Sequence, residues 1–167
     1  MKNNILYIIL ILVLCFGFKA QAQNIVAYET KLKSLSNVKA DELNHLVNGA
    51  TTAIFVTEQN APELYIGKAV GVSVMRVRHT SDFVKLESQF KDVVKEVTLL
   101  DVEWNGKEEI ILPVGLLEKM SNLKYIYIRS YDYLDSTVIK NKFSVLIKQL
   151  QDNLTIEVLF YTMEKPS

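Results

Sequence analysis

The chain has 167 residues, with 19 Lys and Arg against 19 Asp and Glu, so its formal net charge is zero. This length suits one domain with a sizeable core, and the balanced charge excludes a polycation that would bind nucleic acid through its phosphates. The single cysteine is Cys15. Beyond residue 15 the sequence therefore excludes disulfides, thiolate nucleophiles and cysteine-bound zinc.

Residues 1–22 have the features of a secretory signal peptide. Lys2 gives a positively charged start, residues 5–18 form an apolar run, and Ala20 and Ala22 form an A-x-A cleavage site. As a helix the apolar run would rise only about 21 Å, which is too short for a hydrocarbon core of about 30 Å. We therefore expect cleavage before Gln23 and export to the periplasm or the extracellular space, rather than a retained anchor.

The exported chain is expected to carry no lipid. Cys15 follows Leu14, whereas the residue before a lipidated cysteine is normally small. Without its first 22 residues the chain keeps 145 residues (167 − 22) and 17 basic against 19 acidic side chains, a net charge of −2. The Ala-Gln-Ala-Gln ending of the signal and the many Asn, Lys, Ile and Tyr residues resemble export signals of Bacteroidetes.

Residues 23–50 are expected to form an N-terminal helical cap. The first helix is predicted by apolar residues at helical spacing, namely Ile25, Tyr28, Leu32 and Leu35. A second helix begins at Ser36 and ends at Asn48–Gly49, where glycine favours a positive φ. The pattern is typical of a cap over the open end of a stack of repeats. A helix that binds a membrane surface or a partner is the alternative.

From residue 51 to residue 167, strand patterns alternate with helix patterns. Strand-like alternation occurs at residues 53–57, 72–78, 97–103, 123–129 and 155–161. Helices are expected to begin near Asn60, Asp82 and Pro113, and a last helix carries Phe143, Leu146, Ile147 and Leu150. Such an alternation favours an α/β domain. We expect a single parallel sheet of about five strands with helices on its other face.

The strands share a spacing that resembles a leucine-rich repeat. Residues 111–129 read Leu-Pro, a short helix, Asn-Leu and then x-x-Ile-x-Ile, as in one unit of that family. The same frame centres on Ile54, Met75, Leu100, Ile126 and Ile156, with steps of 21, 25, 26 and 30 residues. Asn105 falls where the family keeps an asparagine whose side-chain amide forms hydrogen bonds with backbone groups at the turn. The resemblance covers about residues 50–161 and implies a small solenoid with one open, concave sheet face.

On that open face, charged and aromatic side chains alternate with inward apolar ones. Because neighbouring strands lie about 4.8 Å apart, Arg76 is expected beside Asp101 and Arg78 beside Glu103. The same period of two makes Leu100 buried and Leu99 exposed. The side chains could form lateral ion pairs and a tyrosine ladder, or a binding patch, since Arg and Tyr are enriched at binding hot spots. The candidate binding residues are Arg76, Arg78, Asp101, Glu103, Tyr125, Tyr127 and Arg129.

No motif for hydrolysis, metal binding or nucleotide binding occurs in the sequence. His79 and Asp82 are too close along the chain to converge with Ser81 as a triad, and Asp82 fits a helix cap. Asp132 and Asp135 lack the spacing of a calcium loop. We therefore expect no cofactor, no metal, no nucleic acid and no membrane span once the signal is removed.

These patterns favour an exported, non-enzymatic interaction module that binds a protein or a glycan through the exposed sheet face. The alternative is a small periplasmic hydrolase, or a hydrolase accessory protein, without a recognisable motif. A cleft that holds His79 with a carboxylate within hydrogen-bond reach would favour the hydrolase. An open face of tyrosine and arginine favours binding.

Overall fold

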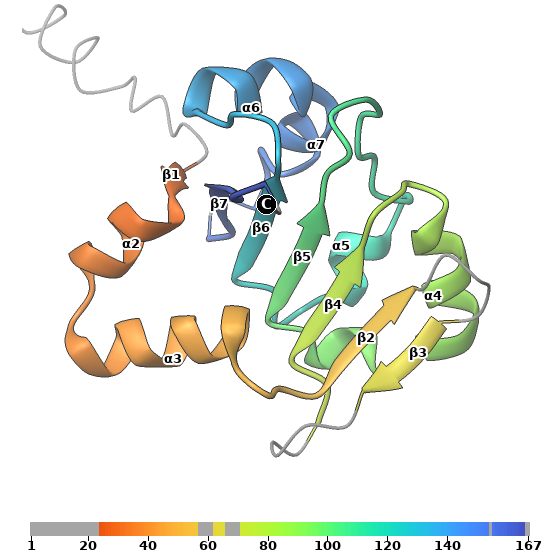
Figure 1. The fold of residues 1–167 in the computed structure, drawn as a ribbon. Helices are drawn as coiled ribbons and strands as arrows, with labels where there is room; N and C mark the ends of the chain where they lie inside the picture. Colours follow the sequence, from red (N-terminus) through yellow and green to blue (C-terminus); the bar gives the residue numbers. More distant parts are fainter. Residues whose placement is uncertain (1–23, 57–61, 66–70, 154, 166–167) are drawn as a thin grey trace, which may run out of the picture.

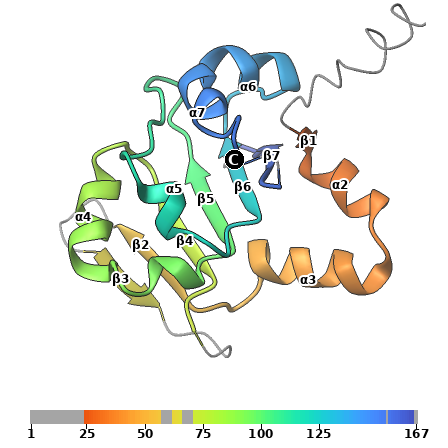
Figure 2. The same ribbon diagram turned by 180° about the vertical axis from the view of Figure 1, so that it is seen from behind.

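The computed structural model describes residues 24–56, 62–65, 71–153 and 155–165. They form one seven-stranded sheet, in the order β1-β7-β6-β5-β4-β2-β3, with helices on both faces (Figures 1 and 2). The strands are β1 (Ile25–Ala27), β2 (Ala53–Val56), β3 (Pro62–Tyr65), β4 (Val74–Val77), β5 (Leu99–Glu103), β6 (Tyr125–Ser130) and β7 (Glu157–Thr162). The helices are α2 (Tyr28–Ser34), α3 (Asn37–Asn48), α4 (Asp82–Phe90), α5 (Leu116–Lys119), α6 (Ser136–Lys142) and α7 (Ser144–Gln149), with a short 3-10 turn, η1 (Val94–Glu96).

The predicted α/β class with a parallel sheet is confirmed. Every pair of neighbouring strands is parallel except β2 and β3, which are antiparallel. The five expected strands correspond to β2, β4, β5, β6 and β7, which lie side by side in sequence order. The estimate of about five strands omitted β1 and β3, which form the two edges of the sheet.

The predicted register is confirmed for the first four of these strands. Ile54 pairs with Met75, Met75 with Leu100, and Leu100 with Ile126. In β7, however, the partner of Ile126 is Val158 and not Ile156. The last strand is therefore shifted by two residues from the predicted frame, which keeps each side chain on its expected face but moves it along the sheet.

One face of the sheet is covered by the helices that connect the parallel strands. Met75, Leu100 and Ile126 pack here with residues of these helices and of the loops before and after them. The helical and loop residues of this cluster include Phe83, Leu116, Met120, Ile139, Phe143 and Leu146. This layer is the main core, and the stripe predicted on Phe143, Leu146, Ile147 and Leu150 faces it, although the helix is interrupted at Phe143 between α6 and α7.

The other face of the sheet is covered in part, which corrects the prediction of an open concave face. Helices α2 and α3 cross it and bury Val74, Leu99 and Leu159 against Tyr28 and Leu43 (Figures 1 and 2). Leu99, expected to be exposed, is 0% exposed, as is Leu100. The covered part includes Val74 and Leu99, the first residues of β4 and β5, whereas Arg76 and Arg129, nearer the carboxyl ends of their strands, stay partly exposed.

The N-terminal segment differs from the expected cap. It begins with β1, which pairs in parallel with β7 at the far edge of the sheet, and only then enters α2. Lys31 of α2 forms an ion pair of 2.6 Å with Glu157 of β7, which fastens this segment to the sheet. The predicted second helix is present as α3, but Gly49 after it has φ −83° rather than a positive φ.

The segment after β2 was predicted as a helix with Asn60 as its cap. Instead, Pro62–Tyr65 form β3, the antiparallel edge strand, and Asn60 lies outside the described residues. Proline is tolerated in an edge strand because its missing N–H interrupts no interior ladder.

The predicted signal peptide, residues 1–22, also lies outside the described residues. No helix within the described ranges is long and apolar enough to span a membrane.

Candidate functional site

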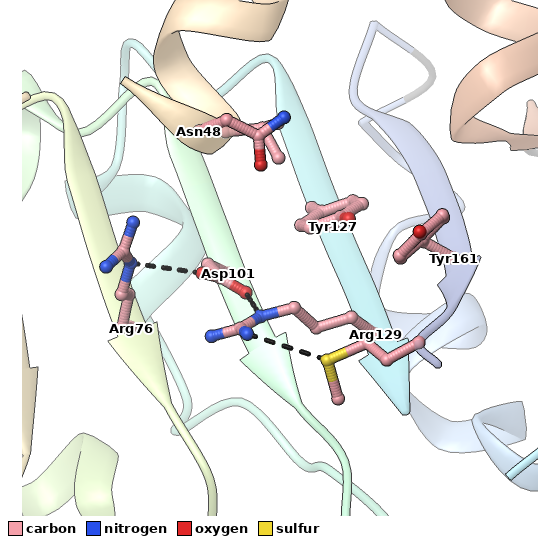
Figure 3. Close-up of a pocket in the computed structure, with 8 residues that line it drawn as sticks. Asn48, Arg76, Asp101, Tyr127, Arg129 and Tyr161 are labelled. Carbon is pink, nitrogen blue, oxygen red and sulfur yellow. Dashed lines mark hydrogen bonds and ion pairs between the residues drawn. The ribbon is translucent and has the colours of Figure 1, made fainter. Parts of the chain in front are cut away.

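A pocket of about 310 Å³ lies on the accessible part of the sheet face that α2 and α3 partly cover (Figure 3). Four adjacent strands contribute side chains to it, and the end of α3 closes one side. It is lined by Val47, Asn48, Arg76, Asp101, Tyr127, Arg129, Tyr161 and Met163. Four of the seven candidate binding residues, Arg76, Asp101, Tyr127 and Arg129, therefore line one cavity.

The predicted ion pairs are present, and Arg129 joins them into one network. Arg76 Nε lies 3.1 Å from Asp101 Oδ2, and Arg78 Nη2 lies 3.2 Å from Glu103 Oε1. Arg129 donates from Nε to Asp101 Oδ1 at 2.9 Å, and its Nη2 lies 3.0 Å from Glu103 Oε2. Three guanidinium groups against two carboxylates leave the network with a net charge of +1 (3 − 2).

Asp101 is the buried centre of this network, with only 3% of its surface exposed. Burial raises the pKa of Asp101, and the nearby Arg129 and Arg76 offset only part of that effect. Burial alone would lower the pKa of Arg129, but the adjacent Asp101 and Glu103 more than compensate, so its pKa is raised and the guanidinium stays charged.

We expect Asp101→Asn to change how stability depends on pH. Because the pKa of Asp101 is higher in the folded protein than in the unfolded chain, where it is about 3.9, the folded protein retains a proton that the unfolded chain has lost. The contribution of Asp101 to the free energy of unfolding is thus greatest below about pH 4 and falls as the pH rises through the folded pKa. Urea unfolding from about pH 4 to about pH 7 measures it. The stability of wild type minus that of Asp101→Asn should fall with pH, and a rising difference would contradict the raised pKa.

Tyr127 of β6 and Tyr161 of β7 line the pocket, and Tyr28 of α2 packs against both of them. The ring of Tyr28 lies 5.3 Å from that of Tyr127 and 6.4 Å from that of Tyr161. The Tyr28 hydroxyl donates to Asn44 Oδ1 at 2.9 Å, and Asn48 Nδ2 donates to the same oxygen at 2.8 Å. These contacts hold the end of α3, and with it Asn48, over the pocket.

The remaining candidate residues lie elsewhere or are buried. Tyr127 is only 4% exposed and packs with Tyr28 and Leu43 in the cluster under α2 and α3. It is therefore part of the pocket wall rather than an exposed contact. Burial raises its pKa, so its phenol stays protonated. Tyr125 faces a different pocket near the amino ends of the strands, beside Leu43 and Lys124. Arg78 and Glu103 extend the ion-pair network beyond the residues that line the pocket.

Sequence reasoning missed Asn48, Tyr161 and Met163. Tyr161 lies beside Arg129 because the last strand is shifted by two residues, and the predicted frame placed Leu159 there instead. A strand frame of Val158 and Phe160 would have revealed Tyr161. Asn48 was interpreted only as a helix end, because nothing in the helical pattern showed that α3 lies across the sheet face.

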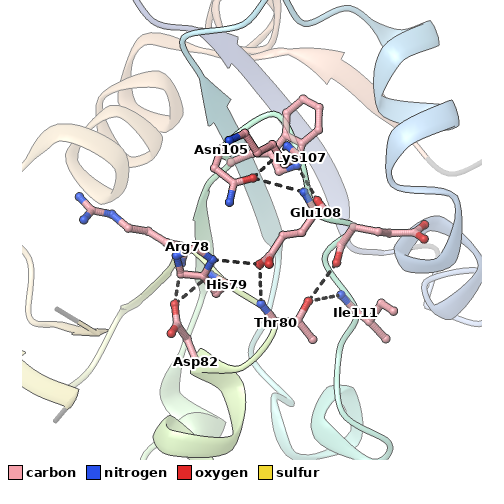
Figure 4. A network of polar contacts seen from close by, with 10 residues as sticks. Arg78, His79, Thr80, Asp82, Asn105, Lys107, Glu108 and Ile111 are labelled. Atoms are coloured by element: carbon pink, nitrogen blue, oxygen red, sulfur yellow. Dashed lines mark hydrogen bonds and ion pairs between the residues drawn. The ribbon is translucent and has the colours of Figure 1, made fainter. Parts of the chain in front are cut away.

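A second polar network lies at the carboxyl ends of β4 and β5 (Figure 4). His79 Nδ1 is 3.2 Å from Glu108 Oε1, and the same oxygen accepts from the Thr80 backbone N–H at 2.9 Å. Asp82 Oδ2 accepts from the backbone N–H groups of Arg78 and His79, both at 2.9 Å, so it fastens the turn before α4 rather than the first turn of that helix. His79 is 48% exposed at its side chain and does not line the 310 Å³ pocket.

Asp132 and Asp135 do not assemble a metal site. Asp135 caps α6, where its Oδ1 accepts from Val138 N at 2.7 Å. In the part of the chain that the structure describes, no group of three or more His, Cys, Asp or Glu side chains could hold a metal ion.

The chain was compared with protein-family models, curated proteins and solved structures, and no match was found in any of the three.

Proposed function

We propose that this protein is an exported, non-enzymatic binding module that holds a protein or a glycan in the 310 Å³ pocket lined by Arg76 and Tyr161. The observation that supports this proposal is the pocket itself, which combines guanidinium, phenol and amide groups from β4, β6, β7 and α3. Arginine and tyrosine side chains offer large contact area together with directional hydrogen bonds.

Export and the leucine-rich-repeat likeness are part of the same proposal. Export rests on the charged start, apolar run and A-x-A site of residues 1–22. The repeat likeness rests on the sequence-ordered parallel strands from β2 to β7, whose connecting helices pack on one face. It is the fold analogy behind a binding role, and fold analogy is a weaker argument for function than the site.

A hydrolase remains the second candidate, because His79 has a carboxylate partner in Glu108 at 3.2 Å. That carboxylate also accepts from the Thr80 backbone, so the contact organises a turn. A substrate could be enclosed in the pocket, but His79 and Glu108 lie outside it. The binding function is therefore the one that the geometry supports better.

We expect the double variant Asn48→Ala/Arg76→Ala to lose a ligand that wild type retains. Both side chains are partly exposed in the pocket, so their loss removes contacts without opening the core. The matched control is Lys91→Ala/Lys95→Ala, which removes two exposed side chains on and beside η1. Wild type, these two variants and His79→Ala are applied to arrays of glycans and of folded proteins, and each array is also assayed for hydrolysis products.

A ligand kept by the lysine control and lost by the double variant supports the pocket. If wild type retains no ligand, or if the lysine control loses the ligand and the double variant keeps it, the binding proposal is wrong. Hydrolysis products that disappear in His79→Ala, but not in the double variant, would favour the hydrolase.

A further inference from the structure

Arg76 and Arg129 share Asp101, but they use their donors differently. Arg129 donates from Nε to Asp101 and from Nη1 to Met163 Sδ at 3.7 Å, while its Nη2 meets Glu103. Arg76 donates no hydrogen bond to any residue that the structure describes. Its Nε lies 3.1 Å from Asp101 Oδ2, close enough for an ion pair, but this buried N–H is not aligned for a hydrogen bond.

The guanidinium of Arg76 thus has donors left for a ligand. Its side chain is 38% exposed, and its terminal nitrogens point away from Asp101 (Figure 3). A guanidinium presents a planar fork of N–H donors that matches the two oxygens of a carboxylate. The geometry therefore suits a planar oxyanion bound by Arg76.

The charge of the site selects among oxyanions. The network carries a net charge of +1, so one additional negative charge would balance it. A phosphate monoester carries nearly two negative charges at neutral pH and would leave excess negative charge beside buried Asp101, which is unfavourable. The site therefore favours a singly charged carboxylate over a phosphate.

The rest of the pocket suits the hydroxyl groups of a sugar. Asn48 uses its Nδ2 to hold Asn44, and no described residue donates to its Oδ1, so this oxygen can accept from a ligand. The Tyr161 hydroxyl has no hydrogen bond among the described residues, although its ring packs edge-on against Tyr28. A pocket of about 310 Å³ is at the small end of ligand sites, which span about 300–1,000 Å³. It accommodates one compact polar unit.

The backbone argues against a peptide C-terminus as the source of the carboxylate. Peptide capture uses free backbone N–H groups or a free strand edge. Here β4, β5 and β6 are interior strands, paired on both sides at Arg76, Asp101 and Arg129. The pocket thus offers side chains and no row of open backbone donors.

We propose that the pocket binds a hexuronic acid residue of an acidic glycan, with the sugar carboxylate on Arg76 and its hydroxyls facing Asn48 and Tyr161. This inference rests on the proposed binding function and specifies its ligand.

Calorimetric titration of the full protein tests it with glucuronate and galacturonate, their neutral counterparts glucose and galactose, inorganic phosphate, and a short peptide with a free C-terminus. Uronates should bind at least about tenfold more tightly than the neutral sugars, because hydrogen bonds to a charged group are lost in the latter. Arg76→Gln should weaken uronate binding by about tenfold or more. The matched control is Lys95→Gln, which removes an exposed cation on η1 outside both the ion-pair network and the pocket lining, and it should leave the Kd within about twofold.

Four results would overturn the inference. The first is a lack of saturation with uronates up to about 10 mM, which is about tenfold above a Kd of about 1 mM. The second is an equal loss of uronate affinity in Arg76→Gln and Lys95→Gln. The third is tighter binding of phosphate than of uronates, and the fourth is tighter binding of a peptide with a free C-terminus. A neutral glycan that binds wild type, and is lost in Asn48→Ala/Arg76→Ala but unaffected by Arg76→Gln, would refute acid recognition while leaving the binding function intact. If wild type retains no ligand on either the glycan or the protein array, both the uronate inference and the binding function are refuted.

Discussion

Leu99→Ala should destabilise the protein as much as Leu100→Ala does. The two neighbours point to opposite faces of β5, yet both are completely buried, Leu100 under the connecting helices and Leu99 under α2 and α3. Truncating a buried leucine to alanine removes its apolar contacts and leaves a cavity, at a cost of about 2–5 kcal/mol. We therefore expect both variants to lose stability within that range, measured by urea denaturation at equal ionic strength.

Val114→Ala is the internal control, because Val114 is 98% exposed and its truncation should change stability by less than about 0.5 kcal/mol. If Leu99→Ala cost less than half as much as Leu100→Ala, the second layer of helices would not be packed on the sheet. The sheet face would then be open, as the repeat pattern predicts.

Asp101→Ala is expected to cost about 3 kcal/mol at neutral pH. Removing one partner of a buried ion pair leaves the other charge uncompensated, which costs about 3–5 kcal/mol in buried sites. Glu103 still neutralises part of Arg129, and Arg76 is partly exposed, so the lower end of this range applies. The raised pKa of Asp101 does not conflict with this expectation, because a buried ion pair can be costly to form and still costly to break.

A double-mutant cycle with Arg129→Met tests the origin of this loss. If the loss comes from an uncompensated charge, Asp101→Ala/Arg129→Met should lose less stability than the sum of its two single variants. Additive losses would show that the two side chains are not coupled, and would contradict the network described here.

The part of the fold that the sequence could predict is the part that repeats along the chain. The spacing of Ile54, Met75, Leu100 and Ile126 predicted both the parallel order and the register, because side chains alternate between faces with a period of two. The ion pairs of Arg76 with Asp101 and of Arg78 with Glu103 followed from that register.

The path of the N-terminal segment could not be predicted in this way. Nothing local to Tyr28 or Leu43 tells whether an amphipathic helix covers the end of a sheet or its face, because both need the same apolar stripe. The face was therefore predicted to be open, and Leu99 and Tyr127 were placed in solvent. The pair Leu99–Leu100 nevertheless indicated burial of Leu99. Parallel strands that are buried on both faces carry continuous apolar runs, whereas a strand with one exposed face alternates apolar and polar residues.

The candidate site was predicted in its charged half only. Arg76, Asp101 and Arg129 came from the strand register, whereas Asn48 and Met163 reach the pocket from the end of α3 and from the segment after β7. Contacts of this kind depend on how segments far apart in the sequence pack together, and a local sequence pattern does not reveal that packing.

The methyl signals of the methionines offer the most direct test of the pocket. Met163 lines it, whereas Met75 and Met120 are buried in the opposite core and serve as controls in the same spectrum. In protein labelled with carbon-13 at the methionine methyl groups, glucuronate should shift the Met163 signal in a saturable way and leave Met75 and Met120 unchanged. In Arg76→Gln the Met163 shift should require about tenfold more uronate or higher to reach the same size. A Met163 signal that stays fixed while another part of the protein binds the uronate, or equal shifts of all three methionines, would contradict a ligand site on this face.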